Sequence, residues 1–293
     1  MRFTSLVRLS ALIAVFALPA DALAASSIRT SSVTGGLVVS GGSPSTMRLH
    51  CGPSAVALNG AVTRRGAGVA ILGSRPGRDA GSWSFRAAAS GAGSRSMSAM
   101  LRCVSVRLPD GFTHTRIDLK TERATDIALG PGATGTARVG CGSQWTATGY
   151  ALDAGGSGDV RLAEVVPGRH GWRFTLENTG ATPARATVST RCLRSKVTAS
   201  APGGETAELR FDVSDLDFTS SLAGEGRRTE TVGCADGRFS VAAGSSVDSA
   251  DSIELVTASP VRRRLSRWVF ENVTPGDRFT GHVLCLRTGS RFH

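Results

Sequence analysis

Six cysteines are spaced in three nearly equal pairs along this 293-residue chain. Cys51 and Cys103 are 52 residues apart, and the members of each later pair are 51 residues apart. Six cysteines allow about 15 pairings, but only the pairing of neighbours along the chain treats the three stretches alike. The spacing therefore predicts three disulfides, each closed within its own stretch. The predicted bonds are Cys51–Cys103, Cys141–Cys192 and Cys234–Cys285.

Other residues recur at matching distances from the first cysteine of each pair. A proline follows 25 or 26 residues later, a Trp-x-Phe motif begins 31 to 34 residues later, and a glycine stands eight residues after each tryptophan. A period of about 90 residues is too long for a solenoid unit and suits a small domain. We therefore expect three copies of one domain, at residues 25–108, 109–200 and 201–293.

Each copy has the pattern of β-strands. Apolar residues alternate before the aligned prolines, as in Val160 and Leu162, which is the period of a strand with one buried face. The two aromatic residues of Trp-x-Phe also point the same way, and core packing is favoured over ligand stacking because aromatic residues dominate small cores. The predicted core residues are Trp83, Phe85, Trp172, Phe174, Trp268 and Phe270.

The fold class that follows is all-β, with three tandem small antiparallel β-sandwich domains of the immunoglobulin-like kind. About seven short strands in roughly 85 residues fit a sandwich better than a single sheet. Domains of this size bury only some 60 to 65% of their unfolded surface. One internal disulfide in each domain is therefore expected to contribute roughly 4 kcal/mol by the chain-entropy model.

The N-terminal residues predict export. Arg2 and Arg8 precede the apolar run LSALIAVFALPA and the small-residue stretch ALA, the order of a secretory signal peptide. Residues 1–24 are therefore expected to be removed by cleavage near Ala24. No later apolar run approaches the roughly 18 residues of a membrane helix. The sequence thus predicts a secreted, periplasmic or cell-surface protein without a membrane span.

The second copy carries a recognisable pattern. PGATGTARVGC leads into Cys141, and GWRFTLENTGATPARATVSTRC leads to Cys192. This resembles a cysteine-bracketed repeat of secreted bacterial proteins, in which a PxGxxGxA turn precedes the first cysteine and a GW strand and an NTG turn precede the second. The resemblance covers most of the mature chain and implies an exported module, to which it attaches no catalytic activity.

Catalytic and metal-binding patterns are weak. None of the five histidines recurs at an equivalent place in the repeat, and no serine stands in a G-x-S-x-G elbow. The acidic group Asp212, Asp215 and Asp217 has oxygen ligands suited to Ca²⁺ but too few of them, and a solvated strand edge explains it. We expect no catalytic residue, no metal and no cofactor.

The remaining signal is positive charge. The net charge is +11, and Lys120 and Lys196 are the only lysines, so nearly all basic residues are arginine. A GC-rich genome would produce the same excess. Several arginines nevertheless fall in one equivalent loop between the aligned proline and tryptophan, where they would suit a polyanion. These candidate residues are Arg78, Arg169, Arg262, Arg263, Arg264 and Arg267.

The sequence therefore predicts a non-catalytic exported protein with a structural, adhesive or surface-binding role. The alternative is an arginine-rich protein that binds a polyanion, such as an envelope polysaccharide, lipopolysaccharide or extracellular DNA. A secreted hydrolase has the least support. The candidate partners are an anionic polysaccharide or the cell-envelope surface. Sequence-specific nucleic-acid recognition is not expected, because the aromatic residues align as core rather than as a stacking platform.

Overall fold

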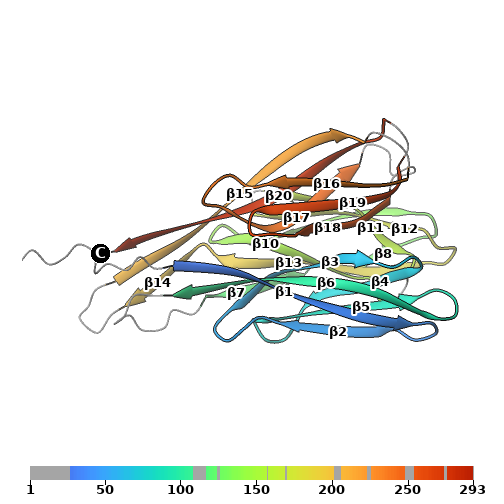
Figure 1. The fold of residues 1–293 in the computed structure, drawn as a ribbon, viewed down its shortest axis with the longest axis horizontal. Coiled ribbons are helices and arrows are strands. Elements are labelled where there is room, and N and C mark those ends of the chain that lie inside the picture. The colour runs from blue at the N-terminus through green and yellow to red at the C-terminus, as the bar shows by residue number, and fades with distance from the viewer. Residues whose placement is uncertain are drawn as a thin grey trace, which may run out of the picture.

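The alternating apolar pattern of the chain produces β-strands throughout (Figure 1). The computed structural model describes residues 27–107, 117–123, 126–156, 158–168, 170–200, 206–222, 226–247, 254–273 and 276–292. Among these residues there is no helix, and hence none that could span a membrane. The predicted signal peptide and its cleavage site lie outside the described residues.

The strands fall into three groups along the chain. The first group is β1 (Ser27–Ser40), β2 (Ser45–His50), β3 (Val56–Arg65), β4 (Val69–Pro76), β5 (Ser82–Ala89) and β6 (Ser94–Arg107). The second group is β7 (Leu119–Arg123), β8 (Ile127–Leu129), β9 (Thr134–Gly140), β10 (Trp145–Asp153), β11 (Val160–Gly168), β12 (Gly171–Asn178), β13 (Ala184–Arg194) and β14 (Lys196–Ser200). The third group is β15 (Thr206–Ser221), β16 (Gly226–Gly233), β17 (Phe239–Val247), β18 (Glu254–Pro260), β19 (Leu265–Val273) and β20 (Arg278–Phe292).

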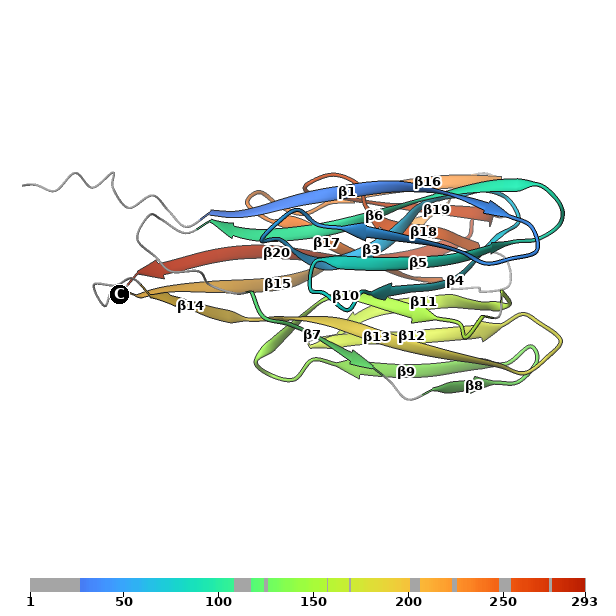
Figure 2. The same ribbon diagram turned by 90° about the horizontal axis from the view of Figure 1, so that it is seen from below.

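The described strands form four sheets, whose named strands pair antiparallel. Sheet 1 has the order β1-β6-β3, and sheet 2 has the order β2-β5-β4-β10-β13-β7, with β8 also paired to β13. Sheet 3 has the order β14-β15-β20-β17-β11-β12-β9, and sheet 4 has the order β16-β19-β18. Figure 2 shows the strands running along the long axis of the molecule.

Sheets 2 and 3 each cross a predicted domain boundary. In sheet 2, β4 pairs with β10 through Ser74 and Leu152, and Arg75 forms an ion pair with Asp153 at 3.5 Å across the same join. In sheet 3, β11 pairs with β17 through Val165 and Ser245. Tandem domains are expected to have separate sheets, so the sharing of sheets 2 and 3 between domains is a feature that the sequence analysis does not predict.

Each disulfide ties two consecutive sheets together. Cys51 follows β2 of sheet 2 and is bonded to Cys103 on β6 of sheet 1. The other two bonds join sheet 3 to sheet 2 and sheet 4 to sheet 3 in the same way, and all three pairings are those predicted. These bonds are Cys141–Cys192 and Cys234–Cys285. Because β18 of sheet 4 also lies against β3 of sheet 1, the four sheets follow one another around a closed ring.

The predicted aromatic residues fill the spaces between the sheets. Trp83 and Phe85 on β5 face sheet 1 in a core with Met97 and Leu101 of β6. The second and third Trp-x-Phe motifs occupy the corresponding places in two further cores. All of the predicted aromatic core residues are buried, namely Trp83, Phe85, Trp172, Phe174, Trp268 and Phe270.

Shifts in strand register recur at equal distances from the first cysteine and from the aligned proline of each copy. Six to eight residues after each first cysteine, the register of the following strand shifts, as at Ala57/Asn59. A second shift falls five to three residues before each aligned proline, as at Ile71/Gly73. The corresponding shifts elsewhere lie at Ala147/Gly149, Ser240/Ala242, Leu162/Glu164 and Leu255/Thr257. Strict apolar alternation therefore ends at the second shift, where Leu72, the residue between Ile71 and Gly73, is buried.

Candidate functional site

Four of the candidate arginines, Arg78, Arg262, Arg263 and Arg264, lie in the loops that follow β4 and β18. Arg78 is exposed in the loop between β4 and β5, where Asp79 accepts hydrogen bonds from the Gly81 backbone at 3.1 Å and from Ser82 Oγ at 2.7 Å. The Ser82 hydrogen bond is the main cause that lowers the pKa of Asp79. This loop therefore has a fixed shape that presents Arg78 to solvent. Arg169 lies outside the described residues.

The loop between β18 and β19 holds most of the other candidate arginines. Arg262, Arg263 and Arg264 are exposed, and Arg267 on β19 is half-buried. The Arg263 guanidinium stacks over the Phe239 ring at 4.5 Å. Arg264 donates from Nε and Nη2 to the Cys234 carbonyl at 3.0 and 2.9 Å and also pairs with Asp236. Arg264 thus ties the β18–β19 loop to the β16–β17 loop.

Two buried arginines that the sequence analysis does not predict join the units of the ring, where a unit is one of the three groups of strands: β1 to β6, β7 to β14 or β15 to β20. Arg102 on β6 donates from Nη1 to Ser32 Oγ at 2.8 Å and from Nη2 to the Arg262 carbonyl at 2.7 Å. It therefore connects sheet 1 with the loop of sheet 4. No carboxylate is bonded to it among the described residues, and burial lowers the pKa of Arg102 to about 10.

Arg191 on β13 makes the equivalent connection from the second unit to β3 and the β4–β5 loop of the first. Its Nε donates to the Ala57 carbonyl at 3.2 Å and its Nη2 to the Ala80 carbonyl at 3.0 Å. Its Nη1 donates to Thr121 Oγ1 at 3.0 Å. Burial lowers the pKa of Arg191 to about 10, although the charge of Asp79 acts in the opposite direction. Each of these arginines directly precedes the second cysteine of its pair, a recurrence that is visible in the sequence.

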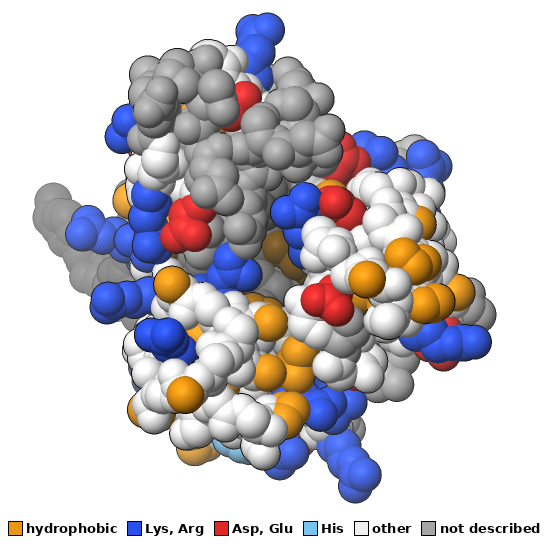
Figure 3. Space-filling view, turned by 90° about the vertical axis from the view of Figure 1, so that its right-hand side faces the viewer, with side chains coloured by type: hydrophobic (Ala, Val, Ile, Leu, Met, Phe, Trp, Pro, Cys, Tyr) orange, Lys and Arg blue, Asp and Glu red, His pale blue; other side chains and the backbone are white. Residues whose placement is uncertain are grey.

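A cavity of about 850 Å³ opens at the end of the molecule opposite the arginine loops. Residues of β3, β4, β10, β11, β18 and β19 line it, so all three units of the ring contribute to its wall. Figure 3 shows this end, where a hollow lies between the described side chains. The larger aliphatic residues of the wall include Val62, Val69, Ile71, Leu152 and Leu162.

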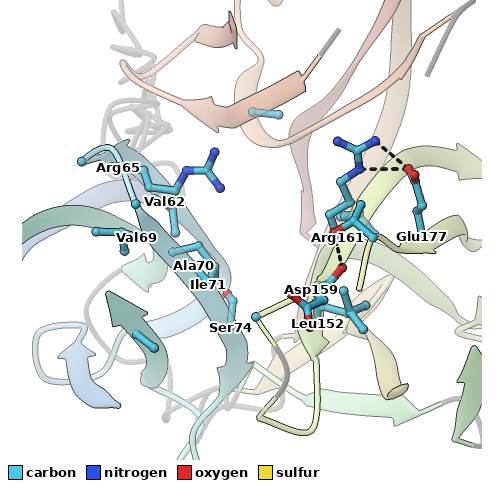
Figure 4. Close-up of a pocket in the computed structure, with 18 of the residues that line it drawn as sticks. Val62, Arg65, Val69, Ala70, Ile71, Ser74, Leu152, Asp159, Arg161 and Glu177 are labelled. Carbon is cyan, nitrogen blue, oxygen red and sulfur yellow. Dashed lines mark hydrogen bonds and ion pairs between the residues drawn. The ribbon is translucent and has the colours of Figure 1, made fainter. Parts of the chain in front are cut away.

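Charged side chains stand at the mouth of this cavity. Arg65 extends from one side, and Arg161 with Glu177 from the other (Figure 4). Arg161 donates from Nε and Nη2 to Glu177 Oε2 at 2.9 and 2.8 Å. The Asp159 backbone oxygen accepts from Thr179 Oγ1 at 2.9 Å. A fifth charged residue of the lining, Glu271, pairs with Arg227 at 3.3 Å.

The acidic residues considered for Ca²⁺ do not gather. Asp212, Asp215 and Asp217 lie on β15, where regular pairing with β20 puts Asp212 on the opposite face from the other two. Asp217 Oδ1 is 2.7 Å from Nδ1 of the buried His282. Within the described part of the chain, no group of three or more His, Cys, Asp or Glu side chains is arranged to hold a metal ion.

Comparisons with known proteins add no functional information. No protein-family model matches the chain, and no curated protein matches it significantly. Function is therefore inferred from the residues and their geometry.

Proposed function

We propose that this chain is an exported, non-catalytic protein with a structural, adhesive or surface-binding role, located in the periplasm, at the cell surface or outside the cell. Its three disulfides support this, because such bonds persist in oxidising compartments. The observation that carries the proposal is the ring of sheets. Consecutive sheets are tied by disulfides, and the ends of the ring meet through β18, β3 and the Arg102 hydrogen bond. Such a body holds its surface loops at fixed positions.

The proposal includes three copies of one immunoglobulin-like sandwich at residues 25–108, 109–200 and 201–293. The recurrence of both register shifts at equal distances from each first cysteine and each proline supports a common ancestor for the copies. In each copy the backbone N–H of the first cysteine also donates to the loop before the Trp-x-Phe strand. These acceptors are the carbonyls of Gly81, His170 and Arg264.

The test of a surface-binding role is retention of the mature protein by envelope material from the producing cell. Disulfide-intact protein should sediment with purified envelope fragments or bind components of a glycan and polyanion array. Protein reduced and alkylated at the six cysteines serves as the control, since it has the same charge without the folded loops. Equal retention of both forms, or retention of neither, would contradict the proposal.

A second candidate function is binding of an anionic polymer, and the exposed arginines favour it. Arg78 and Arg262 have exposed side chains for which the described residues provide no hydrogen bond or ion pair. The Arg102 and Arg191 hydrogen bonds hold their loops against neighbouring units. A guanidinium binds sulfate, phosphate or carboxylate through paired hydrogen bonds. Several such loops on one body would give avidity toward a long polymer.

Retention on heparin against a salt gradient tests this candidate. The variant should replace Arg78, Arg169 and Arg262 with serine, leaving Arg264 to hold its loop. The matched control replaces three exposed arginines on strands, Arg29, Arg48 and Arg138, with serine. The loop variant should elute at clearly lower salt than the control. Equal decreases in the eluting salt concentration for both variants would mean that only bulk charge matters. Failure of the wild type to be retained at about 0.15 M salt would contradict polyanion binding.

A further inference from the structure

The cavity at the end of the molecule, called the end cavity below, exposes apolar residues from the margins of all three hydrophobic cores. Ile71 belongs to the margin of the first core, Leu162 to that of the second, and Ala258 to that of the third. All three line the cavity and are only half-buried. Apolar side chains that would normally be covered therefore face one shared hollow, whose volume of about 850 Å³ lies within the usual range for small-molecule sites.

Small residues keep this hollow open. Alanine and glycine occupy many positions of the wall, among them Ala70, Ala151, Gly158 and Ala163. A methyl group added at Gly158 would lie 3.2 Å from the Ala70 Cβ, so these two residues approach closely across the wall. Larger aliphatic residues at such positions would fill the space, as they do in the three cores. The wall is thus shaped for a narrow apolar guest rather than for self-packing.

The mouth of the cavity provides donors for a negatively charged group. Arg65 and Arg161 stand on opposite sides of the hollow, and each also has an interaction within the protein (Figure 4). Two of the five N–H donors of Arg161 are used by Glu177, and Glu271 is neutralised by Arg227. The Asp159 carboxylate lies beside Gly180 in the β12–β13 turn. The net charge of +11 also attracts anions toward the molecule over longer distances.

From this arrangement we propose that the end cavity binds a single-chain anionic amphiphile. The apolar chain occupies the space between Ile71, Leu152 and Leu162. The carboxylate or phosphate at its end accepts hydrogen bonds from the Arg161 donors that Glu177 does not use, and it faces the positive charge of Arg65 across the mouth. The chemistry is that of a fatty acid or of a single-chain lipid phosphate. The site is separate from the arginine loops at the other end of the molecule, so it does not depend on polyanion binding there.

Calorimetric titration of the mature protein with soluble amphiphiles below their micelle concentrations tests the proposal. Dodecanoate should bind more tightly than dodecyltrimethylammonium or dodecyl maltoside, which share its chain but not its charge. Each methylene added from octanoate to dodecanoate should tighten binding about threefold to fourfold. Comparison of dodecanoate with dodecyl phosphate distinguishes the two sources of the anionic group. Binding of none of these probes, or equal binding whatever the head group, would overturn the proposal.

Variants separate the cavity from general surface binding. Ala70→Leu and Ala163→Leu fill the wall from two different strands, and each should weaken dodecanoate binding at least about tenfold through lost chain burial. Arg65→Gln should weaken dodecanoate binding by about tenfold through loss of one of the two positive charges at the mouth. The matched controls are Ala128→Leu on the exposed face of β8 and Arg138→Gln on β9. Thermal melting monitors folding of every variant. Controls that lose as much affinity as the cavity variants would place the amphiphile elsewhere and overturn the assignment.

Discussion

Arg102 Nη2 donates a 2.7 Å hydrogen bond to the backbone oxygen of Arg262, which lies 160 residues later in the chain. The two residues belong to the first and last units, so this bond helps to close the ring of sheets. Arg102 is 2% exposed, and within the described part of the chain its Nη1 and Nη2 are held by neutral hydrogen-bond acceptors and by no carboxylate. A buried charged donor stabilises the folded state only while its hydrogen-bond acceptors stay in place.

Loss of this bond should open the ring locally. Arg102→Ala should lower the free energy of unfolding by about 1.5–3 kcal/mol, the range for hydrogen bonds to charged groups. Hydrogen exchange should rise in the β18–β19 loop and along the neighbouring part of β3. Arg107→Ala, at the exposed end of the same strand, is the matched control and should change stability by less than about 0.5 kcal/mol. Unchanged exchange in the β18–β19 loop of Arg102→Ala would show that the ring closes without this contact.

Alkaline stability depends on Tyr150, the single tyrosine of the chain. Its hydroxyl donates to the Ala243 carbonyl at 2.9 Å, and burial raises the pKa of Tyr150 well above its ordinary value of about 10. Above about pH 10 the unfolded chain loses this proton while the folded chain keeps it. Tyr150 therefore makes folding less favourable as the pH rises, by up to about 1.4 kcal/mol per pH unit.

Absorbance of the phenolate reports directly on this effect. The signal should appear together with unfolding rather than as a separate titration near pH 10. The stability advantage of wild type over Tyr150→Phe should be constant below about pH 10 and shrink above it. Arg102 and Arg191 act in the opposite sense, because burial lowers the pKa of each guanidinium in the folded chain and so makes its protonated form less favourable there than in the unfolded chain. The comparison with Tyr150→Phe cancels that contribution. A reversible phenolate titration near pH 10 in folded protein would contradict the burial of Tyr150.

The features that sequence could predict are those fixed within one copy. The bond between Cys141 and Cys192 and the burial of Trp172 and Phe174 follow from spacing that repeats. Alternation likewise predicts strands before each proline, but it cannot show the register shift at Leu162/Glu164. A shift inserts one residue without changing the composition of the strand.

Contacts between copies leave much weaker signals. Neither Ser74 nor Leu152 indicates that β4 pairs with β10, because any exposed strand edge can accept a partner. The arginine before the second cysteine occurs in two copies, as Arg102 and Arg191, while Leu284 stands there in the third. Among so many arginines this recurrence does not stand out. The small residues that open the end cavity look like ordinary composition in an alanine-rich and glycine-rich sequence.

Close approach of the units requires glycine at position 149. A Cβ at Gly149 would lie 2.3 Å from the Leu58 backbone oxygen and 2.9 Å from the Asn59 Cβ, so β10 and β3 could not keep their present distance. Gly149→Ala should cost about 1–3 kcal/mol, as overpacking in a closed interior does. Gly289→Ala is the control, because β20 has open space around Gly289. Equal stability of the two variants in urea denaturation would mean that β10 can move away from β3 at little cost.

Trp172 offers the sharpest test of whether the units fold together. It is 2% exposed, its ring centroid lies 4.9 Å from that of Tyr150, and a Cβ at Gly244 on β17 would be 3.1 Å from it. Trp172→Ala should cost about 3–5 kcal/mol. Because sheet 3 continues from β12 through β11 to β17, exchange should also rise in β17 and β20, within one cooperative melting transition.

Trp145 is the matched control for this substitution, since it is half-buried at the surface with Lys120 4.8 Å from its ring. Trp145→Ala should cost no more than about 1 kcal/mol, the scale of an exposed cation–π contact, and should leave exchange in β17 unchanged. The decisive comparison is therefore exchange in β17 and β20 of Trp172→Ala at matched stability. If only β9 to β13 lose protection while β17 and β20 keep it, each unit holds its own structure, and the continuous sheet transmits little of the damage.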